Sequence, residues 1–210
     1  MFERLTSSRL MIVIRGLNLK EASDLCYLLY ENGVHFAEVS FSDESSGELL
    51  RNLKTSFGGR LFLGAGTVFR ESTYSEAVRS NADFVLSPGL SSDIAELSRR
   101  DGVPYIPGVY TATDIQNSLE MGYSLLKLFP AGAERGIDLV KAYSGPFPEA
   151  KFMAFGGITV SNAGSYIKSG AVALGIGSFI ANSKLLSEKN YKELEERILS
   201  LKKAVGEIDV

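Results

Sequence analysis

One lysine of this sequence lies inside an apolar run, where its position could make it reactive. Lys127 is the third residue of the stretch LLKLFP, whose composition is typical of a buried strand. Burying an ammonium group costs much free energy unless the group is paired with a carboxylate or loses its proton. A neutral lysine amine is a nucleophile that can attack a ketone to form an imine. The residue therefore indicates either covalent chemistry or a structural ion pair.

A glutamate in a second stretch could be the partner of this lysine. In AEVSFS, polar and apolar residues alternate, which places Glu38, Ser40 and Ser42 on one face of a strand. A carboxylate close to a neutral amine can pass protons to and from a bound substrate. Two further polar side chains stand at the ends of other expected strands: Arg15 ends MIVIR, and Thr67 follows GAG.

Two glycine-rich stretches later in the chain are suited to bind a phosphate group. FGGIT contains Gly156 and Gly157, and GIGSFI contains Gly177 and Ser178. Glycines let backbone N–H groups approach an anion closely, and the start of a following helix adds a positive partial charge. Each stretch alone is equally well explained by a tight turn, but the two together favour phosphate binding.

The elements that must position these residues repeat along the chain. β-rich runs alternate with segments of helical periodicity, and most of these segments end at a residue such as Gly33 that favours helix termination. Eight such units predict a single (β/α)8 barrel over residues 1–210, with an open doubly wound sheet as the alternative. The runs begin near Met11, His35, Leu61, Asp83, Pro104, Ser124, Lys151 and Val172.

A (β/α)8 barrel carries its active site at the carboxyl ends of its strands. Side-chain alternation then directs Lys127, Glu38 and Arg15 into one lumen, with Thr67 at the end of the third strand. The two glycine stretches follow the seventh and eighth strands, which is the usual phosphate position in such barrels. We therefore expect one site that combines an amine, a carboxylate, a guanidinium group and phosphate-binding backbone.

Composition and charge argue against several other classes of protein. The 210 residues include 22 Lys or Arg and 25 Asp or Glu, interspersed along the chain, so no nucleic-acid-binding surface is expected. The apolar strip near the start is too short for a signal segment or a membrane span, which indicates a cytoplasmic protein. With Cys26 as the one cysteine and His35 as the one histidine, no disulfide, zinc site or Ser-His-Asp triad is expected.

Taken together, the motifs resemble one known family. In chain order, IVIRG, AEVSF, LGAGTV, LLKLFPA, FGGIT and GIGS are similar to the 2-keto-3-deoxy-6-phosphogluconate (KDPG) aldolases. The phosphogalactonate and 4-hydroxy-2-oxoglutarate (KHG) aldolases are relatives of that group. The resemblance runs from about Arg15 to Ser178. It implies a class I aldolase that acts on a phosphorylated 2-oxo acid, forms a homotrimer and needs no metal or cofactor.

The resemblance also implies a role for each candidate residue. Lys127 would form the Schiff base, and Glu38 would be the general acid and base. Arg15 and Thr67 would hold the carboxylate of the 2-oxo acid. The reaction would be cleavage of KDPG to pyruvate and glyceraldehyde 3-phosphate. The phosphate would be held by Gly156, Gly157, Gly177 and Ser178.

Two positions depart from the commonest pattern of that family. Many members carry an arginine where this chain has Ser42, whereas others have the strand 1 arginine instead, as Arg15 here. Many members also carry a threonine where this chain has Phe155. The same chemistry on the phosphogalactonate epimer or on KHG is therefore an alternative. Two further alternatives are a phosphosugar isomerase with Glu38 as its base and a phosphosugar-binding barrel without activity.

Overall fold

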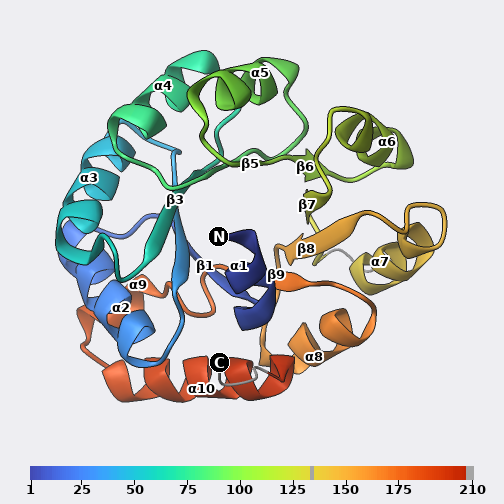
Figure 1. Cartoon of the computed structure of the whole chain (residues 1–210). Helices are drawn as coiled ribbons and strands as arrows, with labels where there is room; N and C mark the ends of the chain where they lie inside the picture. Colours follow the sequence, from blue (N-terminus) through green and yellow to red (C-terminus); the bar gives the residue numbers. More distant parts are fainter. Residues whose placement is uncertain (133–134, 207–210) are drawn as a thin grey trace.

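Strands and helices alternate along most of the chain and wind into a barrel with most of the helices around the outside (Figure 1). The structure is a computed structural model that describes residues 1–132 and 135–206. Within these residues, no helix is long and apolar enough to cross a membrane.

The strands are short and the helices mostly run for two or three turns. The strands are β1 (Leu10–Ile14), β2 (Phe36–Ser40), β3 (Phe62–Gly66), β4 (Val85–Leu86), β5 (Tyr105–Ile106), β6 (Gly108–Val109), β7 (Leu125–Leu128), β8 (Lys151–Phe155) and β9 (Ala173–Ile176). The helices are α1 (Phe2–Ser8), α2 (Leu19–Glu31), α3 (Ser46–Phe57), α4 (Glu71–Arg79), α5 (Ser92–Asp101), α6 (Ala112–Glu120), α7 (Gly136–Ser144), α8 (Val160–Lys168), α9 (Ser183–Ser187) and α10 (Tyr191–Val205).

The strands of the described residues form one parallel sheet in the order β5-β4-β3-β2-β1-β9-β8-β7-β6. Because β5 and β6 are neighbours in the chain, this order nearly closes the sheet into a barrel, and the predicted (β/α)8 fold is confirmed. A parallel sheet is covered on both faces, which explains why most of its strands are apolar along their whole length.

The barrel strand expected from Pro104 onward is interrupted, which was not predicted from the sequence. β5 pairs with β4 and β6 pairs with β7, with Pro107 between the two short strands. Proline has no N–H group to give to a sheet ladder. The Pro107 carbonyl still accepts a hydrogen bond of 2.9 Å from the main-chain N–H of Lys127. The chain thereby changes from one neighbouring strand to the other at this point.

Alternate residues of each strand enter two separate apolar cores. On β2, Ala37 and Val39 belong to the core between strands and helices, whereas Phe36 belongs to the core inside the barrel. The outer core also receives the predicted apolar stripe of α2. Cys26 on that stripe is fully buried, and burial raises the pKa of its thiol to about 12. We conclude that this cysteine packs and is not reactive in the folded chain.

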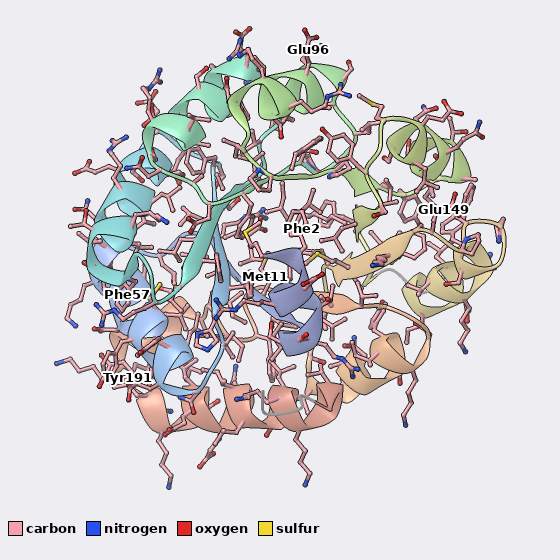
Figure 2. The ribbon with its side chains drawn as sticks, viewed as in Figure 1. Phe2, Met11, Phe57, Glu96, Glu149 and Tyr191 are labelled. Atoms are coloured by element: carbon pink, nitrogen blue, oxygen red, sulfur yellow. The ribbon has the colours of Figure 1, made fainter. Side chains whose placement is uncertain are left out.

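The helix α1 closes the end of the barrel where the strands begin. It was not predicted from the sequence. Leu5 is 1% exposed and packs in the inner core with residues at the starts of strands, such as Phe36 and Leu125. Figure 2 shows Phe2 and Met11 close to the centre of the barrel. This apolar plug leaves the carboxyl ends of the strands as the place for a site.

Replacing Leu5 with alanine should destabilise the barrel, because the change leaves a cavity in the inner core. Truncations of this kind cost about 2–5 kcal/mol of unfolding free energy. Leu199→Ala is the matched control, because Leu199 on α10 is 51% exposed and its loss should cost less than about 0.5 kcal/mol. Urea unfolding followed by circular dichroism measures both values. Equal losses in the two variants would contradict the role of α1 as a plug.

Candidate active site

The carboxyl ends of the strands surround a cavity of about 390 Å³. It brings together the lysine, the glutamate, the arginine and both glycine stretches that were singled out in the sequence. Thr67 is not part of the lining among the described residues. Those that line the cavity are Val13, Arg15, Glu38, Lys127, Phe129, Phe155, Gly156, Gly157, Ile158, Thr159, Gly175, Gly177, Ser178, Phe179 and Ala181.

The lysine of β7 is buried between a carboxylate and two aromatic rings. Lys127 is 6% exposed, and its Nζ lies 3.7 Å from Oε1 of Glu38. The same nitrogen lies 4.6 Å from the ring centre of Phe155 and 5.5 Å from that of Phe129. A separation of 3.7 Å is an ion-pair contact but is too long for a hydrogen bond. The amine is therefore held near the carboxylate without being locked to it.

The glutamate of β2 has an oxygen without a hydrogen-bond partner among the described residues. Glu38 is 2% exposed, and its Oε2 is buried without a hydrogen-bond partner among the described residues. The carboxylate packs on Gly66 of β3, where an added Cβ atom would overlap Oε2. A buried oxygen without a partner costs free energy, so this atom is a natural place for a water molecule or a substrate hydroxyl.

A hydrogen-bonded cluster joins the ends of β1, β2 and β3. Arg15 Nε donates to Ser40 Oγ over 3.0 Å, and a terminal nitrogen of Arg15 donates to Thr67 Oγ1 over 3.4 Å. The two hydroxyl oxygens lie 2.9 Å apart. Thr67 has a φ of 63°, which is rare for a β-branched residue and is typical of functional sites. Ser40 lies on the face predicted by alternation, although no role was assigned to it from the sequence.

Backbone conformation explains the glycines that follow β8. Gly156 has a φ of 96° and Gly157 a φ of 67°, in the region that favours glycine. Gly132 packs so closely on this turn that a Cβ atom there would overlap the Gly156 carbonyl. Beside Gly177, after β9, an added Cβ would meet no atom within 4 Å. Thr159 caps the start of α8, whose positive partial charge lies at this wall of the cavity.

Two aromatic side chains form the wall next to the amine. Phe155 ends β8 and is 2% exposed, and its ring lies on Gly175 of β9, where a Cβ atom would overlap it. Phe155 was noted in the sequence only through the family resemblance, and Phe129 was not singled out. Alternation was the available signal, because Phe129 has the parity of Lys127 and Phe155 has that of the inward-facing Met153.

The charged side chains in the described lining of the cavity are those of Arg15, Glu38 and Lys127. Residues 1–132 and 135–206 contain no cluster of three or more His, Cys, Asp or Glu side chains that could hold a metal ion. The chemistry that the cavity's own side chains offer is therefore that of an amine beside a carboxylate, with a guanidinium group to bind an anion.

A comparison with families of known proteins decides between the possibilities for this site. Residues 1–197 match the family model described as KDPG and KHG aldolase. The chain belongs to the KDPG and KHG aldolase family. The resemblance inferred from the motifs is thereby confirmed, and the protein is an aldolase, which is a carbon–carbon lyase. The match includes every residue of the cavity lining.

Relatives of this aldolase match it over nearly their whole length. A 2-dehydro-3-deoxy-phosphogluconate aldolase of Haemophilus influenzae is 33% identical over 192 residues, which cover 91% of this chain and 90% of the relative. The KHG/KDPG aldolase of Escherichia coli K12 is 27% identical over 190 residues, covering 90% and 89%. A solved structure of the Legionella pneumophila KDPG aldolase, with pyruvate captured as a covalent carbinolamine, is 30% identical, covers 94% and 95%, and has a TM-score of 0.85.

Replacing Gly66 with alanine should slow aldol cleavage, because the added methyl group occupies the place of the Glu38 carboxylate. A shift of about 1 Å in a reacting group can cost about a hundredfold in rate, so a loss of at least about tenfold in kcat is expected. Unfolding free energy should fall by about 1–3 kcal/mol. Gly145→Ala is the control, because a Cβ atom there meets nothing within 4 Å. Unchanged turnover in Gly66→Ala would show that the position of Glu38 does not matter for the reaction.

Proposed function

We propose that this aldolase cleaves KDPG to pyruvate and glyceraldehyde 3-phosphate through a Schiff base on Lys127. The observation that carries the proposal is the buried amine of Lys127, 3.7 Å from Oε1 of Glu38 in the cavity. The choice of substrate is supported by relatives named KDPG aldolase, among them the one from H. influenzae at 33% identity. The covalent pyruvate in the L. pneumophila relative supports the imine route.

The reaction begins when Lys127 gives a proton to Glu38 and its neutral amine attacks the C2 ketone of the substrate. Glu38 then returns this proton to the departing hydroxyl group, so that water leaves. The product is a protonated imine, which accepts electrons from the bond that will break. The rings of Phe155 and Phe129 lie 4.6 and 5.5 Å from the nitrogen. Their negative faces accommodate the positive charge of the imine.

Glu38 moves the protons of the reaction. Its carboxylate removes the proton of the C4 hydroxyl, directly or through a water molecule, and the C3–C4 bond breaks. Glyceraldehyde 3-phosphate leaves, and the electron pair of the broken bond converts the imine to an enamine. The protonated Glu38 then returns a proton to C3, and hydrolysis of the new imine releases pyruvate and the free amine. Oε2 of Glu38, which has no hydrogen-bond partner among residues 1–132 and 135–206, supports this role.

The two ends of the substrate are held by different parts of the cavity. Arg15 binds the C1 carboxylate with Thr67, to which it is hydrogen-bonded, and a guanidinium fork suits that anion. The phosphate is held by backbone N–H groups of the loops after β8 and β9, at the start of α8. The residues of these loops are Gly156, Gly157, Gly177 and Ser178.

One observation supports an alternative substrate. The wall at Phe155 is apolar, as it is in the phosphogalactonate-type members that the sequence resembles, so the phosphogalactonate epimer is the alternative to KDPG. KHG is a weaker alternative, because it carries no phosphate for the two glycine loops.

We also propose that the chain works as a homotrimer, as the family resemblance implies. Light scattering on the purified protein should give three times the mass of one chain, which is 22.8 kDa. A mass equal to that of one chain would contradict this assembly.

Reduction with cyanoborohydride in the presence of pyruvate should attach a reduced pyruvyl group to Lys127, located by peptide mass spectrometry. Lys127→Ala should remain folded, lack the adduct and lose turnover. Lys151→Ala is the matched control, because Lys151 is exposed at the start of β8, on the far side of the barrel from the cavity. An intact, folded protein without any adduct would contradict the Schiff base and favour an isomerase or a binding protein.

The substrate is tested by the release of pyruvate, followed with lactate dehydrogenase. KDPG should give a higher kcat/KM than its phosphogalactonate epimer or KHG. A preference for either of these two would replace the substrate while leaving the Schiff-base chemistry in place.

A further inference from the structure

The cluster at the ends of β1, β2 and β3 contains a residue to which no role has been assigned. Ser40 is 3% exposed and lies on the inward face of β2, two residues after Glu38. Its Oγ accepts a hydrogen bond from Arg15 Nε over 3.0 Å and lies 2.9 Å from Thr67 Oγ1. Ser40 is therefore the common contact of the two residues proposed to hold the substrate carboxylate.

The chemistry of the three groups sets the direction of these hydrogen bonds. A guanidinium group has only donors, so Arg15 donates to both hydroxyl oxygens, and one hydroxyl must donate to the other. If Thr67 donated, the hydroxyl proton of the buried Ser40 would have no acceptor among the described residues. If Ser40 donates, its hydroxyl group is satisfied both as donor and as acceptor. The hydroxyl proton of the half-buried Thr67 is then available for a further hydrogen bond. This direction leaves donors on Thr67 and Arg15 for an incoming anion.

Arg15 is a side chain that needs such an anchor. It is exposed, and it lies just beyond β1 beside Gly16, whose φ of 66° marks a turn. A long exposed side chain loses much rotamer freedom when it binds a ligand. Fixing the guanidinium before the ligand arrives removes that cost from binding.

We infer that Ser40 is a positioning residue that holds Arg15 and Thr67 ready to bind the carboxylate of the 2-oxo acid. The inference rests on the proposed function, in which Arg15 and Thr67 bind the carboxylate of the substrate. It adds that the carboxylate site is formed before binding and depends on a residue outside the cavity lining. The site should therefore favour 2-oxo acids over uncharged ketones through Ser40.

Ser42 offers a matched control two residues after Ser40, just beyond the end of β2. Its Oγ contacts the main-chain oxygen of Ser40 over 3.4 Å, and its side chain is exposed. Ser42→Ala and Ser40→Ala each remove one hydroxyl group, but only the hydroxyl group of Ser40 contacts the side chains of Arg15 and Thr67. Ser40→Thr keeps the hydroxyl group at the position of interest and serves as the conservative variant.

Cyanoborohydride trapping on Lys127 at a series of pyruvate concentrations tests the inference. Ser40→Ala should raise the half-saturating pyruvate concentration about tenfold, as expected for the loss of one hydrogen bond to a charged group. The maximal trapping rate should stay within about twofold of the wild type. Methyl pyruvate, which has no carboxylate charge, should show no such increase. The half-saturating pyruvate concentration of Ser40→Thr should stay within about threefold of the wild-type value. That of Ser42→Ala should equal the wild-type value.

A double variant tests whether Ser40 acts through the arginine. Arg15→Lys keeps the positive charge and removes the Nε–H donor. Because the contact of Ser40 with Arg15 is then already lost, adding Ser40→Ala should raise the half-saturating pyruvate concentration by less than about threefold. A further tenfold rise, equal to the effect in the wild-type background, would overturn the inference.

The remaining outcomes distinguish a failure of the inference about Ser40 from a failure of the proposed function. Wild-type pyruvate affinity in Ser40→Ala, or equal weakening for pyruvate and methyl pyruvate, would leave Ser40 a purely structural residue. If Ser40→Ala does not fold, Ser40→Cys can replace it, because the thiol fills the same space and is only a weak acceptor. This variant should show the same selective loss of affinity for pyruvate. Wild-type affinity in Ser40→Cys would overturn the inference. The absence of any adduct in the wild type would instead contradict the proposed function.

Discussion

The surrounding structure depends on one constraint, which is that an amine and a carboxylate are buried together at one end of an apolar barrel. Taking each ion out of water costs several kcal/mol, and the contact of 3.7 Å between Lys127 and Glu38 offsets part of that cost. The neighbouring strands must then leave room for both groups. Gly66 on β3 makes space for the carboxylate, and Gly175 on β9 makes space for the ring of Phe155 beside the amine. Each of these glycines is required by a close approach across the sheet.

The two ends of the barrel divide stability and chemistry between them. At the end where the strands begin, α1 inserts Leu5 into an apolar core. At the other end lie the features that a stable core would avoid, namely a buried lysine, an unpartnered oxygen of Glu38 and the left-handed backbone of Thr67. Local violations of this kind are tolerated when the rest of the fold compensates for them. In the cavity region these features occur together, which indicates that the site was built at a cost in stability.

Side-chain alternation was enough to predict that Glu38 and Lys127 meet in the cavity, because period two on β2 and β7 leaves only one inward face for them. Three features escaped the same approach. The helix α1 is only 7 residues long, so it depends on docking against the barrel and not on its own periodicity. Pro107 divides a barrel strand because it has no N–H group. Predicting this effect requires knowing both strands that pair with it. The contacts of Ser40 depend on the backbone of Thr67, whose φ of 63° cannot be read from a threonine in the sequence.

The position of the arginine shows which part of the proposed carboxylate site is under constraint. Ser42 stands where many family members have an arginine, and here the guanidinium group comes from Arg15 on the neighbouring strand. Both strands end beside the hydroxyl groups of Ser40 and Thr67, so a long side chain from either strand can reach the same place. Because the arginine side chain is long, it can reach this place from either strand. The short serine side chain can hold only a group directly beside it, as in its 3.0 Å contact with Arg15. We therefore expect the hydroxyl anchors on β2 and β3, more than the strand that supplies the arginine, to decide where the carboxylate lies.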